Sequence, residues 1–160
     1  MVRYSHNQES EISSRSTDLS IESGIQNWTL ERHRREHEKD LAWLHSQVST
    51  IEEAEPHRQI IIATHYSLTN GSRANDPRHE GSAVSSNFAT DLSHETSWLS
   101  PTVNLWAFGH TYYSFSFRDE KNKKFLVSNQ RGYVRLCAGR KKAGMKARVV
   151  EAGKEGWELI

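Results

Sequence analysis

IIIATH, at residues 60–65, is a short run of β-branched apolar residues that stops at two polar ones. Three consecutive isoleucines followed by Ala63 favour a β-strand, and a run without polar alternation is typical of a strand covered on both faces. Such strands occur in the middle of an α/β or α+β fold. His65 would then lie where this strand ends and a loop begins.

The residues before this run predict one long helix. From residue 29 to residue 51, apolar side chains recur at spacings of three and four, and Thr29 is placed to cap the first turn. Pro56 closes the segment. His33 and His37 stand four residues apart, a spacing at which two imidazoles can share one metal. The charged residues around them favour a solvated helix face instead.

The residues after this run predict a small sheet. A long connection, in which residues 84–98 could form a short helix, leads to a second apolar run that ends at Gly109 and His110. Residues 113–118 then alternate between aromatic and polar, and a charged turn at residues 119–124 returns the chain to a partner strand. We expect a helix near residues 29–53 and strands near 59–64, 103–108, 112–118, 124–129 and 147–150.

Composition narrows the class of protein. The 160 residues fit one domain, and a hydrophobic share of 35% predicts a modest core with long polar loops, or a fragment of something larger. Cys137 is the single cysteine, no apolar run is long enough to span a membrane, and no signal peptide is recognisable. These features favour a reducing compartment, and we expect a cytoplasmic location.

His65 and His110 are the candidate metal ligands, because each follows an apolar strand. Side chains at strand ends are held rigidly and yet face solvent. Imidazole nitrogen suits divalent transition metals such as Mn, Fe and Zn. Neither a phosphate-binding glycine-rich loop nor the serine elbow of hydrolases occurs in the sequence.

These histidines lie in two stretches that resemble the C-terminal half of the calcineurin-like metallophosphoesterases, in particular their fungal cytosolic members. The stretches are IIIATHYSLT at residues 60–69 and LWAFGHTY at residues 105–112. Three further segments fit the same branch: DLAWL at 40–44, FATDL at 88–92 and SNQRGY at 128–133.

The resemblance covers about residues 24–133 and suggests three parts of the chain. Residues 1–24 would form an irregular segment, residues 25–135 the C-terminal half of a phosphoesterase domain, and residues 136–160 a basic, weakly ordered tail. The fold would be a partial β-sandwich flanked by helices.

The resemblance also implies a chemistry. In that family, two divalent metals lie at the strand ends, bridged by an aspartate and a hydroxide, and hydrolyse phosphomonoesters or phosphodiesters. It implies that His65 is a metal ligand and that His110 is the first histidine of the Gly-His-x-His motif. Tyr112 stands at the second histidine of that motif, as a possible third ligand, and its phenol is a poor substitute for a neutral imidazole.

The N-terminal motifs of the family are absent from this sequence. It contains no Asp-x-His, no Gly-Asp-x-x-Asp and no Gly-Asn-His followed by an acidic residue. These segments supply the bridging aspartate, the asparagine and a phosphate-contacting histidine. We therefore expect a truncated metallophosphoesterase, with weak or incomplete metal binding and impaired or absent hydrolysis.

A basic stretch supports an alternative function. Residues 121–148 hold ten lysines and arginines and no acidic residue. Such a stretch could bind nucleic acid or another polyanion, with aromatic residues at 113–117 as stacking surfaces. The overall net charge of +1 does not favour this function by itself.

Overall fold

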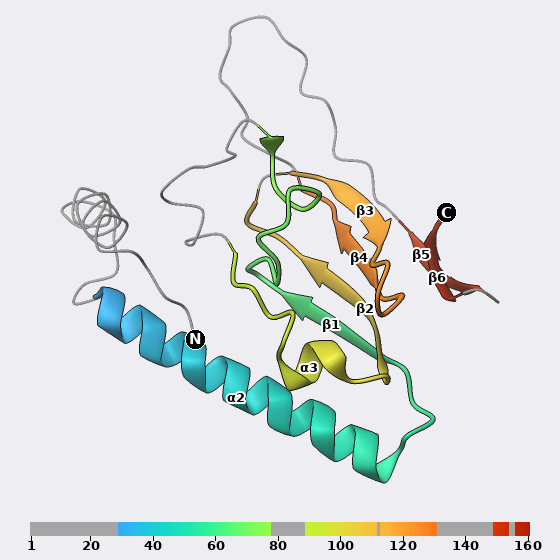
Figure 1. The fold of residues 1–160 in the computed structure, drawn as a ribbon, viewed down its shortest axis with the longest axis horizontal. Helices are drawn as coiled ribbons and strands as arrows, with labels where there is room; N and C mark the ends of the chain where they lie inside the picture. Colours follow the sequence, from blue (N-terminus) through green and yellow to red (C-terminus); the bar gives the residue numbers. More distant parts are fainter. Residues whose placement is uncertain (1–28, 78–88, 112, 131–148, 154–155) are drawn as a thin grey trace, which may run out of the picture.

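The computed structural model describes residues 29–77, 89–111, 113–130, 149–153 and 156–160. These residues form a mixed α/β structure with a four-stranded sheet, a separate two-stranded hairpin and one long helix (Figure 1). In chain order the elements are α2 (Leu30–Ala54), β1 (Ile60–Thr64), α3 (Thr96–Leu99), β2 (Val103–Phe108), β3 (Phe115–Arg118), β4 (Phe125–Ser128), β5 (Val150–Gly153) and β6 (Gly156–Leu159). The coarse fold class expected from the sequence is confirmed. No helix in these ranges combines the length and the apolar character that a membrane span requires.

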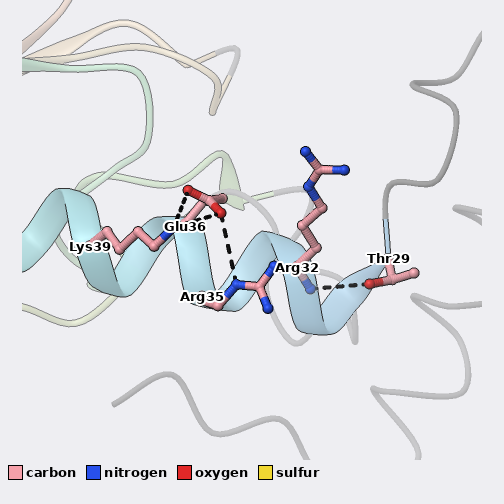
Figure 2. A network of polar contacts seen from close by, with 5 residues as sticks. All are labelled: Thr29, Arg32, Arg35, Glu36 and Lys39. Atoms are coloured by element: carbon pink, nitrogen blue, oxygen red, sulfur yellow. Dashed lines mark hydrogen bonds and ion pairs between the residues drawn. The ribbon is translucent and has the colours of Figure 1, made fainter.

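Helix α2 begins where the sequence predicted. The Thr29 hydroxyl accepts a hydrogen bond from the Arg32 backbone N–H at 3.1 Å, which satisfies one of the free donors of the first turn. On the exposed face Glu36 lies between Lys39, at 3.0 Å, and Arg35, at 3.8 Å (Figure 2). Solvent screens exposed ion pairs of this kind, so they contribute little to stability, and packing of the opposite face holds the helix in place.

The main sheet has the strand order β1-β2-β4-β3. Strands β1, β2 and β4 run parallel, and β3 runs antiparallel to β4 (Figure 1). The four predicted strands of this sheet are confirmed, although β3 begins only at Phe115, and Tyr112 lies outside the described residues. The carboxyl ends of β1, β2 and β4 therefore meet at one edge of the sheet.

The larger core lies between the sheet and the two helices. Ile62, Trp106 and Leu126 come from adjacent parallel strands and pack with Val48 of α2 and Trp98 of α3. Trp106 is fully buried, and its indole N–H donates to the Thr64 hydroxyl at 3.0 Å. This bond satisfies the one polar atom of the largest core side chain.

The face of β1 that points away from the helices is less covered than the sequence predicted. The isoleucine run predicted a strand covered on both faces, but Ile61 is 51% exposed and Ala63 is also exposed. The β5–β6 hairpin covers only part of this face: it packs Val150 and Trp157 onto residues of β2 and β4. Beside the hairpin an open groove of about 400 Å³ remains, lined by Ile61 and Ala63 among others.

The connection between β1 and β2 contains less helix than expected. The sequence allowed a helix over residues 84–98, and the described part of that range is helical only in the single turn of α3. Residues 89–92 run alongside residues 67–68 instead, with hydrogen bonds from the Thr90 N–H to the Ser67 carbonyl and from the Leu92 N–H to the Leu68 carbonyl. Pairing with a distant segment has overridden the local helical pattern.

Candidate metal centre

His65 and His110 lie together at the carboxyl edge of the sheet. His65 follows β1 directly, and His110 follows β2 after Gly109. Their ring centroids are 4.6 Å apart, with the ring planes inclined by 52°. Parallel pairing of β1 with β2 is the reason, since it places both strand ends side by side. The prediction that the two imidazoles lie close together at one edge of the sheet is confirmed. That they share one cation stays a prediction.

The backbone around His110 is tightly turned. The Thr111 N–H donates to the Gly109 carbonyl at 2.8 Å, and His110, at the centre of this three-residue turn, has a φ of 65°. A three-residue turn with positive φ at its centre is rare and strained for a residue with a side chain. Strained backbone of this kind persists only where surrounding contacts hold it, and it is concentrated at functional sites.

Tyr66 joins the two histidine rings into a cluster. Its ring lies 5.2 Å from the ring of His65, 4.8 Å from that of His110 and 5.9 Å from that of His33, which comes from α2. Burial raises the pKa of Tyr66 above 10, so its phenol stays neutral and protonated near pH 7. Tyr66 therefore packs against the histidines as a neutral ring.

Nothing in the sequence singled out Tyr66, and the charged residues around His33 and His37 favoured a solvated helix face. That expectation is wrong for both histidines, which are half-buried. His37 Nε2 is hydrogen-bonded to the Thr90 hydroxyl at 3.3 Å. The contacts depend on how α2 packs over the strand ends, which helical spacing does not reveal. The only signal in the sequence was the spacing of four between the two histidines.

Burial favours the neutral, metal-binding form of these rings. Burial first, and then the nearby His65, lower the pKa of His110 below its ordinary value of 6.5. Burial first, and then the nearby His33, lower the pKa of His37 in the same direction. A neutral imidazole has the free nitrogen lone pair that a metal ion needs, and the lowered pKa of His110 favours that neutral form.

The candidate site has few potential metal ligands among the described residues. Among the described residues, no group of three or more histidine, cysteine, aspartate or glutamate side chains is arranged to hold a metal. Asp76 and Asp91, the carboxylates of the connecting segment, join no such group, and the Asp91 carboxylate accepts a hydrogen bond from the Ser93 N–H. Tyr112 lies outside the described residues. Among the described side chains, the two histidines thus have no carboxylate beside them that could bridge a pair of metal ions.

The structure describes only the beginning of the basic stretch. Lys121 and Lys123 are exposed in the turn between β3 and β4, but Lys124 is 3% exposed and its ammonium group donates to the carbonyls of Ser100 and Val103. Residues 131–148, including Cys137, lie outside the described ranges. Lys124 is therefore a structural residue and is not available to a polyanion.

The proposed stacking surface is also part of the core. Phe115 is buried, and Tyr113 and Phe117 are packed against the same cluster of core residues. Bases stack on aromatic rings that face solvent, so these three side chains are poorly placed for that purpose. The described residues therefore lend little support to a nucleic-acid interface.

No family model, no curated protein and no solved structure matches this chain. The sequence and the geometry of its own residues therefore carry the functional proposal.

Proposed function

We propose that this chain carries part of a calcineurin-like metallophosphoesterase centre, in which His65 and His110 bind a single divalent transition-metal ion. The observation that supports it best is the 4.6 Å separation of the two rings at the ends of neighbouring parallel strands. Zn²⁺ binds imidazole nitrogen at about 2.0–2.1 Å, and Mn²⁺ and Fe²⁺ also accept this ligand. Small rotations of two rings already in contact would bring both nitrogens onto one ion.

The same proposal interprets the fold as part of a two-layered sandwich. The main sheet has α2 and α3 on one face and the β5–β6 hairpin on part of the other (Figure 1). The site lies at the edge where parallel strands end, which is where open α/β sheets bind ligands. The single cysteine in the sequence supports a reducing, cytoplasmic location as part of this proposal.

Phosphoester hydrolysis by this chain alone is proposed to be negligible. When two metal ions are bound, they stabilise the attacking and leaving oxygens of a phosphoester, provided that they lie about 3.5–4 Å apart. Ligands must offset the roughly four positive charges of such a pair. His65 and His110 are neutral, and the described residues add no bridging carboxylate. The two histidines can orient one cation, and through it one phosphate oxygen. The described residues hold no group of three or more ligands for the second metal ion of the family's centre.

Metal titration and a phosphodiesterase assay test the proposal together. Calorimetric titration with Zn²⁺ should give one weak site per chain in the wild type, and none in the double variant His65→Ala, His110→Ala. His57→Ala is the matched control, because His57 is exposed in the turn before β1 and should leave the site intact. With Mn²⁺ and bis-p-nitrophenyl phosphate, the wild type should match the double variant.

Two results would contradict this function. Equal Zn²⁺ binding by the wild type and the double variant would exclude a site at His65 and His110. Turnover well above the double variant would show that the chain assembles a working centre from residues beyond those two.

A further inference from the structure

Gln130 lies at the same sheet edge as His65 and His110, two residues after the end of β4. Its side-chain amide nitrogen donates to the Thr111 hydroxyl at 2.8 Å and to the Ser128 hydroxyl at 2.7 Å. The Tyr113 carbonyl is a third, longer acceptor at 3.4 Å. One amide group thus connects the end of β4 to the segments that follow β2 and precede β3.

These hydrogen bonds lie away from water. Thr111 is 8% exposed and Ser128 is 1% exposed, so neither hydroxyl has ready access to solvent as a substitute partner. The backbone of Gln130 is held as well: its N–H donates to the Ser114 hydroxyl at 2.8 Å, and that hydroxyl is 3.2 Å from the Gln130 carbonyl, to which it donates. Gln130 is therefore held by hydrogen bonds to both its backbone and its side chain.

Thr111 is the residue directly after His110, so the hydrogen bond from Gln130 to Thr111 lies next to a candidate metal ligand. The turn at His110 has its unfavourable φ of 65° and needs support on both sides. On one side, the Gly109 N–H donates to the His65 carbonyl at 3.1 Å. On the other side, Thr111 is held by Gln130. The two attachments flank His110 in the chain, one at the backbone of Gly109 and the other at the side chain of Thr111.

We infer that Gln130 is a positioning residue for His110, acting through Thr111, and that it sets the affinity of the two-histidine site for a metal. This inference rests on the proposed metal site. Partners that orient a metal ligand without touching the metal typically contribute 10–100-fold to affinity. Here the partner acts through the backbone turn, because Gln130 contacts the residue next to the ligand.

Co²⁺ provides a probe of both affinity and geometry, because its visible absorption depends on the arrangement of its ligands. Gln130→Leu and Thr111→Val each remove one partner of the hydrogen bond with little change in size. Each should weaken Co²⁺ binding by about 10-fold and alter the absorption spectrum. Thr111→Ser keeps the hydroxyl and should restore wild-type affinity and spectrum.

Two controls separate positioning from general destabilisation. Gln59→Leu makes the same chemical change at an exposed position before β1, at the opposite end of that strand, and should bind Co²⁺ like the wild type. The double variant Gln130→Leu, Thr111→Val should bind Co²⁺ no more weakly than Gln130→Leu alone, because Gln130→Leu has already removed the donor to the Thr111 hydroxyl. Far-UV circular dichroism shows whether each variant is folded, and if Gln130→Leu is not, the comparison of Thr111→Val with Thr111→Ser decides.

Wild-type affinity in both Gln130→Leu and Thr111→Val would overturn the inference, as would failure of Thr111→Ser to restore binding. If the wild type itself binds no Co²⁺, the proposed function fails, and the positioning role is decided on the metal-free protein. The ring ¹H–¹⁵N signals of His110, assigned by their loss in His110→Ala, should then shift in Thr111→Val and remain in place in Thr111→Ser. Unchanged signals in Thr111→Val would refute it.

Discussion

The Gly109 N–H donates to the His65 carbonyl at 3.1 Å, so the residue before one candidate metal ligand is bonded to the backbone of the other. This bond lies just beyond the last paired residues of β1 and β2, Thr64 and Phe108. Parallel pairing therefore continues past the strands and brings the two imidazole rings into contact. The backbone therefore sets the positions from which the two rings approach each other.

The strain at His110 predicts an unusual order of stability. For a residue with a side chain, the left-handed region costs about 1–2 kcal/mol that glycine avoids, partly offset by glycine's greater flexibility in the unfolded chain. His110→Gly should therefore be more stable than His110→Ala by about 1 kcal/mol, measured by urea unfolding, although neither should bind metal. At Ser116, in β3, the order should be reversed, with glycine less stable than alanine. An alanine variant at 110 as stable as the glycine variant would show that the turn is unstrained.

The pKa of His37 predicts how stability changes with pH. Because burial lowers this pKa below 6.5 in the folded chain, the unfolded chain takes up the proton first as the pH falls. The stability that the neutral His37 side chain contributes is therefore complete above about pH 6.5. It decreases as the pH falls from 6.5 towards the pKa of His37 in the folded chain. His37→Gln should therefore lose less stability than the wild type between pH 7.5 and 5, measured by urea unfolding. His57→Gln, at an exposed histidine, serves as the control, and an equal slope in His37→Gln would contradict the prediction.

The exposed face of β1 predicts that the same substitution destabilises the protein much more at Ile62 than at Ile61. Ile62 is 5% exposed within the core, so Ile62→Ala should cost about 2–5 kcal/mol of unfolding free energy. Ile61 is 51% exposed, and Ile61→Ala should cost less than about 1 kcal/mol. The same substitution at neighbouring positions is its own control. Similar losses at both positions would mean that the second face of β1 is also covered.

The buried ammonium group of Lys124 predicts a structural role. Lys124→Met keeps most of the aliphatic chain but leaves the carbonyls of Ser100 and Val103 without this donor. Hydrogen bonds to charged groups typically contribute about 1.5–3 kcal/mol, and urea unfolding should show a loss of that size. Lys121→Met, at an exposed position in the same turn, should change stability by less than about 0.5 kcal/mol. A loss at Lys121 equal to that at Lys124 would contradict this role.

Local patterns in the sequence were sufficient to predict helix α2, the four strands of the main sheet and the position of the histidine pair, but not strand β6. Helix α2 follows from apolar spacing and from Thr29, whose hydroxyl forms the cap without help from distant residues. The β3–β4 hairpin follows from alternating side chains and a charged turn. His65 and His110 were identified because each follows an apolar run, and neighbouring parallel strands end side by side. The helix and the hairpin depend on residues close together in the chain, whereas the meeting of the two histidines also depends on the pairing of β1 with β2.

The environment of the histidines depended on tertiary packing. His33 reaches Tyr66 only because α2 lies over the strand ends, and Gln130 reaches Thr111 only because β4 is inserted between β2 and β3. The exposure of Ile61 likewise depends on how far the β5–β6 hairpin extends across the sheet. Contacts between residues far apart in the chain depend on the packing free energy of the whole fold. A local pattern of apolar residues contains no information about that free energy. Spacing could therefore identify the two candidate ligands, whereas only the folded chain revealed what holds them in place.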